Sequence, residues 1–344
     1  MKKVLVILTL LFCSAICIGE LKAEITTDEE FNNFFTYYYL NPQPNEAPSA
    51  LRQFISSDFF KSQQPTEIYA MQSYFFGRIA QMNPVLISEY MNLFNDTTHE
   101  GRVFILMIFQ ISGNEQVKAF LQTKLDKEDF INEREDIKNV LKGGMPIDFN
   151  PLRREIEDGA DLDFLWTEFF ITGIKEPIVK IIDVLSWEDR FKNKLTNWLS
   201  AKHSKRETKK LNNLLNRVGI NIDINKHNLN LLSDFDCMFA AHFQSFGFAG
   251  KKSEHGEEII KILDFSDDDK FYMAIKGAAM WALQSNAQQH PKVLEYCKQE
   301  FEQRADKSKI ELAIILELAS KGSIELVPTE EEDVAILKLR EENK

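Results

Sequence analysis

Hydrophobic residues recur along the chain at the three- and four-residue spacing that places them on one face of an α-helix. Residues 162–170, 178–185 and 312–319 each form such a stripe. A capping-box pattern, Thr27 with Glu30, precedes an aromatic run and predicts another helix start. The pattern predicts a mostly all-α protein.

Short breaks separate these helices in a way that forms a weak, irregular repeat. Each unit is an apolar helix, a break, and a second helix with a valine or isoleucine near its start. The breaks contain Gly77 with Pro84, Gly113 with Asn114, Gly173 with Pro177, and His290 with Pro291. Glycine at such a break suits a left-handed helix cap, and proline suits a first helical turn. We therefore expect an irregular helical-hairpin stack, HEAT-like or TPR-like. The alternative is an ordinary helical domain with similar turns.

Three segments do not follow the helical pattern and divide the chain. Residues 143–150 contain two glycines and a proline, and we interpret them as a linker between helical regions 24–142 and 151–327. Residues 219–224 alternate with period two, which is typical of a short strand. Residues 328–344 form a charged tail, and residues 324–339 alternatively form a small β-hairpin.

Residues 1–23 have the three-part pattern of a secretory signal peptide. Lys2 and Lys3 precede an apolar stretch that ends near Ile18, and the best cleavage point follows Ala23. An uncleaved anchor is the alternative, although the stretch is short for a membrane span of about 20 residues. The pattern predicts a bacterial protein that is periplasmic or secreted, with no membrane span in the mature chain.

The net charge of the chain narrows the classes of partner. The formal net charge is −12, and removing residues 1–23 makes it about −14. A general nucleic-acid binder usually needs a basic face, so we expect no nucleic acid as partner.

The predicted mature chain keeps Cys237 and Cys297. An oxidising compartment permits a disulfide between them, and two buried thiols are the alternative.

One basic segment reverses the local charge of this acidic chain. Nine lysines and arginines lie between residues 190 and 217, together with the single carboxylate Glu207. Such a run suits an anionic partner, for example a phosphate-bearing glycan. The alternative, which we favour, is the solvated side of helices whose other side carries leucines.

The sequence contains no recognised motif for catalysis, metal binding or cofactor binding. The chain has no His-Glu-x-x-His, no Cys-x-x-Cys and no Gly-x-Ser-x-Gly motif. We therefore expect no metal and no cofactor, and an enzyme is the less favoured interpretation. Aromatic residues beside helix breaks are the candidate binding surface, and core packing is the alternative for each of them. They are Tyr38, Trp166 and Trp281.

Three stretches resemble a family of exported bacterial helical proteins of uncharacterised function. They are Tyr38–Pro44, Asp161–Trp166 with Phe169–Gly173, and Ala278–Ala287. The resemblance implies export and a helical fold, and it carries no catalytic residues. Our leading hypothesis is a binding or scaffolding protein for an unknown protein, peptide or glycan. The alternatives are an envelope-polymer hydrolase and a secreted effector that acts on a host.

Overall fold

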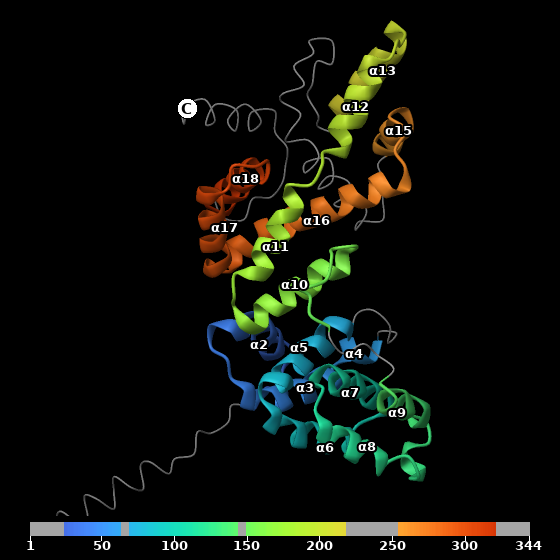
Figure 1. Cartoon of the computed structure of the whole chain (residues 1–344), viewed down its shortest axis with the longest axis vertical. Coiled ribbons are helices and arrows are strands. Elements are labelled where there is room, and N and C mark those ends of the chain that lie inside the picture. The colour runs from blue at the N-terminus through green and yellow to red at the C-terminus, as the bar shows by residue number, and fades with distance from the viewer. Residues whose placement is uncertain (1–23, 63–68, 144–148, 218–253, 321–344) are drawn as a thin grey trace, which may run out of the picture. The chain divides into compact units, whose positions relative to one another are not determined.

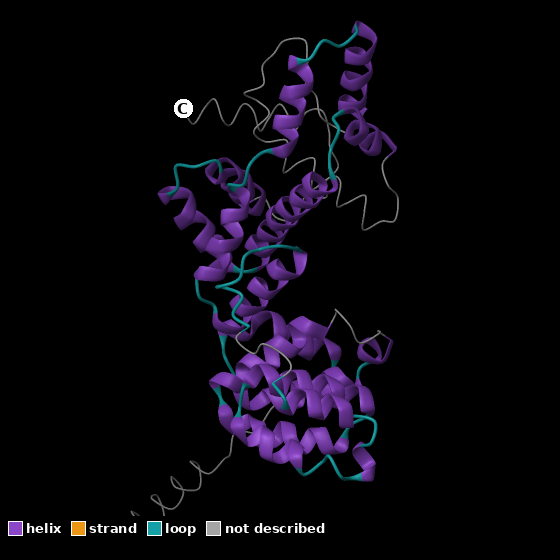
Figure 2. Ribbon diagram, turned by 45° about the vertical axis from the view of Figure 1, so that its right-hand side comes forward, coloured by secondary structure: helices purple, strands orange, loops and turns teal. Residues whose placement is uncertain are grey.

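The computed structural model describes residues 24–62, 69–143, 149–217 and 254–320, and these residues are almost entirely helical (Figures 1 and 2). Within these ranges there is no β-strand. The predicted all-α stack of helical hairpins is therefore confirmed. The predicted signal peptide, the period-two segment 219–224, the β-hairpin and the charged tail lie outside the described residues.

The chain divides into two compact units. Unit 1 comprises residues 1–150 together with 167–173, and unit 2 comprises residues 151–166 together with 174–344. The first boundary falls at the end of the predicted linker 143–150, of which residues 144–148 lie outside the described residues. Residues 167–173, which complete helix α10 (Gly159–Thr172), group with unit 1 although they follow 151–166 in the chain.

Unit 1 contains short helices joined by tight turns. They are α2 (Asp28–Tyr37), η1 (Tyr38–Leu40), η2 (Pro44–Glu46), α3 (Ala47–Ser56), α4 (Asp58–Ser62), α5 (Tyr69–Met82), η3 (Pro84–Leu86), α6 (Ile87–Asp96), α7 (His99–Ser112), α8 (Glu115–Gln122), η4 (Glu128–Phe130) and α9 (Arg134–Leu141). Helices α5 and α7 share the most extensive packing in this unit. Its core is aromatic: Phe75, Phe76 and Phe104 are fully or almost fully buried. Such rings bury large apolar areas, which suits a fold built from short helices.

A buried polar cluster ties residues 167–173 to helix α5 within unit 1. The hydroxyl of Tyr74 donates to Oε2 of Glu168 over 2.7 Å. Arg78 donates to the same carboxylate through Nε at 3.3 Å and Nη2 at 3.2 Å. Glu168 is 2% exposed, so these donors replace the water that its charge loses on burial.

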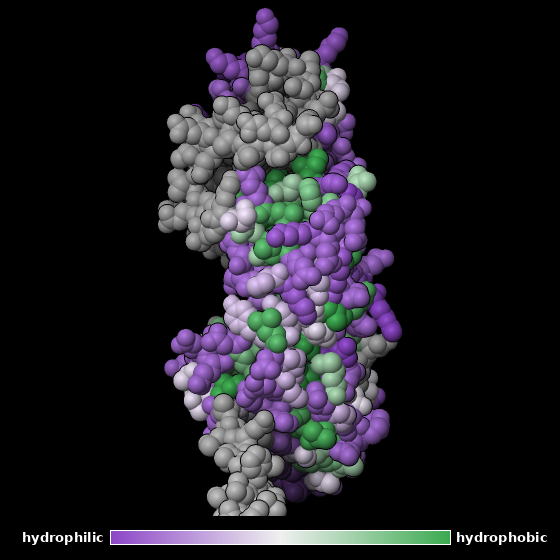
Figure 3. All heavy atoms as spheres, turned by 90° about the vertical axis from the view of Figure 1, so that its left-hand side faces the viewer, coloured by the Kyte–Doolittle hydropathy of each residue, from purple (hydrophilic) through white to green (hydrophobic). Residues whose placement is uncertain are grey.

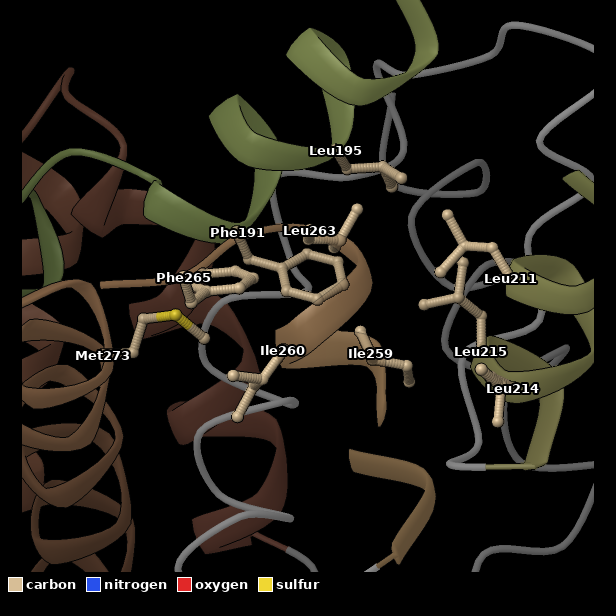
Figure 4. Packing of buried hydrophobic residues seen from close by; sticks show 10 residues of the cluster. All are labelled: Phe191, Leu195, Leu211, Leu214, Leu215, Ile259, Ile260, Leu263, Phe265 and Met273. Atoms are coloured by element: carbon tan, nitrogen blue, oxygen red, sulfur yellow. The ribbon is translucent and has the colours of Figure 1, made fainter. Parts of the chain in front are cut away.

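Unit 2 contains the longest helix among the described residues, α16 (Asp267–Gln289). Its helices are α11 (Glu176–Leu185), α12 (Arg190–Ser200), α13 (Lys205–Arg217), α15 (Glu254–Ile262), α16, α17 (Pro291–Gln303) and α18 (Ser308–Ser320). Helix α16 packs against α11, α17 and α18. A second cluster joins α12, α13, α15 and the start of α16 (Figure 4). The side chains of Leu211 and Leu215 point from α13 toward Ile259 in that view.

The helix ends follow most of the predicted signals. The Thr27–Glu30 capping box is present. Gly113 caps α7 with φ 61°, and Gly173 follows α10 with φ 63°, both in the left-handed region. The prediction for Gly77 is wrong, because this residue lies inside α5. A Cβ atom there would stand 2.6 Å from Cβ of Ile111, so glycine permits a close approach of α5 to α7.

No helix among the described residues combines the length and apolarity that crossing a membrane requires. On the face shown in Figure 3, hydrophobic residues form separate groups among hydrophilic ones.

Candidate functional site

The candidate site is a pocket in unit 1, formed where helix α2 meets the turn that leads into α3. Its volume is about 310 Å³, at the small end of the range for ligand pockets. The lining combines aromatic rings, amides and carboxylates, with no lysine or arginine. The lining residues are Glu24, Ile25, Glu30, Asn33, Phe34, Tyr37, Tyr38, Asn41, Gln43 and Glu46.

The chain segment before α2 forms one wall, and α3 holds it in place. Ile25 buries its side chain, and its backbone N–H donates to Oγ of Ser49 over 3.4 Å. Ser49 in turn donates to the carbonyl oxygen of Glu46 over 2.9 Å. The wall therefore depends on backbone contacts as well as on apolar burial.

Two of the three carboxylates in the pocket are paired with backbone N–H groups or with an arginine. Oε2 of Glu30 accepts from the backbone N–H groups of Thr26 and Thr27, at 2.8 and 3.0 Å. These backbone donors hold the pKa of Glu30 below its usual value. The carboxylate of Glu24 lies 3.8 Å from the guanidinium of Arg52, and both side chains are exposed.

Glu46 is the third carboxylate, and its surroundings differ. Nε2 of Gln43 donates to it over 2.9 Å, and Oε1 of Gln43 accepts from the side-chain amide of Asn41 over 2.7 Å in the orientation that satisfies both neighbours. Burial raises the pKa of Glu46. Among the residues that the structure describes, no lysine or arginine forms an ion pair with it. The pocket therefore contains a partly desolvated carboxylate that a bound cation would stabilise.

Aromatic rings complete the pocket. The rings of Phe34 and Tyr38 meet edge to face with centroids 5.2 Å apart, and both contact Phe75 of α5. Tyr38 is 4% exposed, and burial raises its pKa to about 12, so its hydroxyl stays protonated at neutral pH. A lining that combines aromatic residues with a carboxylate suits a cationic group, chiefly through charge pairing.

The three residues of the predicted binding surface lie in different surroundings. Tyr38 lines this pocket while its ring packs into the core. Trp166 is buried at 6% exposure, within unit 2. Trp281 is 59% exposed on α16. Tyr38 belongs to unit 1, and the two tryptophans belong to unit 2. Cys297 is fully buried on α17, and burial raises its thiol pKa to about 12, whereas its predicted partner Cys237 lies outside the described residues.

Sequence reasoning missed the acidic half of the pocket. Glu46, Gln43 and Asn41 lie in a proline-rich turn, and no binding role was predicted for them from the sequence. The available signal was the aromatic run of α2 followed closely by a turn rich in amides. In the described part of the chain, no three His, Cys, Asp or Glu side chains group in a way that would hold a metal ion.

Comparisons with protein-family models, with curated proteins and with solved structures find no match to this chain. The resemblance to exported helical proteins therefore stays a prediction.

Proposed function

We propose that this chain is an exported binding protein whose pocket in unit 1 takes a ligand bearing a cationic amine. Suitable ligands are a peptide with a lysine side chain or a glycan with a free amino sugar. Export rests on the signal-peptide pattern of residues 1–23. The observation that carries the ligand class is the pocket lining, in which Glu46 and aromatic rings stand together with no basic residue.

Binding is favoured over hydrolysis by the state of the carboxylates. Hydrolysis of a glycosidic bond needs two free carboxyl groups on opposite sides of the bond. Here Glu30 is held by backbone donors and Glu24 lies beside Arg52, which leaves Glu46 alone. A single carboxylate with aromatic neighbours is sufficient to recognise an amine.

The test compares matched ligands that differ only in the amine. Titration calorimetry of the purified protein would use acetyl-lysine amide against acetyl-norleucine amide, and glucosamine against glucose. We expect one cationic member to bind and its neutral counterpart to bind at least about 10-fold more weakly, since a charge-assisted hydrogen bond contributes about 1.5–3 kcal/mol.

Two variants of equal charge change assign the effect to the pocket. Glu46→Gln removes the proposed partner of the amine, whereas Glu29→Gln changes an exposed residue of α2 that does not line the pocket. We expect only Glu46→Gln to weaken the amine, by about 10-fold. Equal binding of neutral and cationic ligands, or equal effects of the two variants, would refute the proposal.

The pH dependence provides an independent check. The pKa of Glu46 is raised by burial, so its charge is lost on acidification before that of an ordinary glutamate. Amine binding should therefore weaken as the pH falls from neutral, and Glu46→Gln should remove that dependence.

A further inference from the structure

The nine cations of the basic segment in unit 2 include two groups, and Lys192, which is half-buried, belongs to neither. Arg190 and Lys194 lie 3.6 and 3.0 Å from the carboxylate of Asp269, and Lys210 pairs with Glu258 of α15. These ion pairs join α12 and α13 to the helices beneath them. The charges of this first group are therefore already paired with carboxylates of neighbouring helices.

A second group of cations in this segment does not join helices through ion pairs. It consists of exposed lysines and arginines for which no ion pair exists among the described residues, and we call it the α13 basic face. Its members are Lys202, Lys205, Arg206, Lys209 and Arg217.

Helix geometry places the four members within α13 on the side away from the core. Leu211, Leu214 and Leu215 are buried in the cluster with α15 (Figure 4). At 3.6 residues per turn, Lys205 and Lys209 fall on the opposite side of the helix. The two sides of α13 are therefore separated, and the leucine side is confirmed as core.

Among the described residues, no carboxylate forms an ion pair with the cations of this face. The one carboxylate between residues 190 and 217 belongs to Glu207. Its Oε2 accepts from the backbone N–H and the hydroxyl of Ser204, at 2.8 and 2.7 Å, in a capping arrangement. Charges farther away than about 8 Å are screened at physiological salt, so the acidity of the whole chain does not cancel this patch.

The position of the cations opposes the helix dipole. Lys205 and Arg206 stand in the first turn of α13, where the partial positive charge of the helix N-terminus disfavours cations. Cations there reduce helix stability slightly and add to the positive potential of the same end. Helix stability therefore does not explain their presence, whereas attraction of an anion does.

We propose that the α13 basic face binds a linear anionic polysaccharide. The four cations in α13 extend over the length of the helix, with Lys205 and Lys209 about 6 Å apart along its axis and Arg217 about 12 Å farther on, which suits an extended polymer more than a single small anion. The residues between them on this side, Asn213 and Asn216, are polar and exposed. Within α13, this side of the helix thus offers no apolar residue to enter a lipid bilayer and no aromatic ring on which a nucleic-acid base would stack.

The test uses a heparin octasaccharide as the sulfated linear probe and dextran as the neutral control. Binding to the purified protein would be measured by calorimetry over a series of salt concentrations. We expect heparin to bind, dextran not to bind, and the affinity to fall steeply with salt. The variant Lys205→Gln, Arg206→Gln, Lys209→Gln keeps side chains that favour helices and should weaken heparin binding roughly 100-fold at low salt.

A matched control removes the same net charge elsewhere. Lys61, Lys118 and Lys127 are exposed in unit 1, and their triple replacement by glutamine should leave heparin binding within about twofold, since these residues lie outside the basic face. Circular dichroism verifies that both variants remain helical. No heparin binding at low salt, or equal losses in the two variants, would overturn the proposal. Stronger binding to anionic vesicles or to a single-stranded oligonucleotide than to heparin would overturn the assigned partner.

Discussion

Replacing Gly77 by alanine tests whether the close approach of α5 and α7 holds unit 1 together. The added Cβ would stand 2.6 Å from Cβ and 2.7 Å from Cγ2 of Ile111, and 3.1 Å from the carbonyl oxygen of Ile108. Carbon atoms in good contact are about 3.5–4.0 Å apart, so the shortfall is about 1 Å. Because Cβ of Ile111 is fixed to its backbone, a change of rotamer does not remove the clash.

Two opposing terms set the expected size of the effect. Overpacking of this kind costs about 1–3 kcal/mol, and the upper end applies because a helix must move. Alanine gains about 0.8–1.0 kcal/mol over glycine inside a helix. We therefore expect a net loss of about 2 kcal/mol in the free energy of unfolding, or a melting temperature lowered by about 5 °C in a unit of this size.

The matched control is Gly101→Ala in α7. There the nearest atoms are Oγ1 and Cγ2 of Thr97, which a rotation about χ1 moves, whereas Cβ of Thr97 stays 3.2 Å away, so we expect a smaller cost than for Gly77→Ala, below about 1 kcal/mol. Urea unfolding followed by far-ultraviolet circular dichroism measures both variants. If Gly77→Ala stabilises the protein, or costs no more than Gly101→Ala, glycine at position 77 is not required by packing.

Two further predictions concern buried polar groups. Glu168→Gln should lower the free energy of unfolding of unit 1 by about 1–3 kcal/mol, since Tyr74 and Arg78 lose a charged acceptor, and an unchanged urea midpoint would contradict this. Burial lowers the pKa of His290 from 6.5 to about 4, so its contribution to stability is lost as the pH falls from about 6.5 to 4. His290→Leu should therefore make unit 2 less sensitive to acid. Melting temperatures at pH 4.5 and 7 measure this, and an unchanged difference between the two temperatures would show that the sign is wrong.

The sequence predicted much of the fold because local signals and packing agree in most helices. The apolar stripe of 178–185 becomes α11, and the Thr27–Glu30 capping box begins α2 as expected. Gly77 shows the limit: glycine serves both left-handed caps and close helix contacts, and only the position of Ile111 distinguishes them. That position depends on residues distant in sequence, which a local pattern does not contain.

The candidate site was less predictable for a related reason. Tyr38 was identified from its place beside a helix break, and it lines the pocket. Glu46 is a candidate because its carboxylate is partly buried with no described lysine or arginine paired to it. Both conditions depend on the fold and not on the residue type. Trp281 and Trp166 share a sequence context, yet one is exposed and the other buried, because only tertiary packing decides which side of a helix is covered.

The division into two units gives each an optical signature of its own. All four tryptophans, Trp166, Trp187, Trp198 and Trp281, belong to unit 2, whereas six of the eight tyrosines lie in unit 1. Indole fluorescence therefore reports mainly the melting of unit 2, with Trp166 next to the boundary inside α10, and the tyrosine bands of the near-ultraviolet spectrum report mainly unit 1. Coincident transitions by the two probes would mean that the units unfold as one cooperative body, and separate transitions would allow each to be assigned its own free energy without cutting the chain.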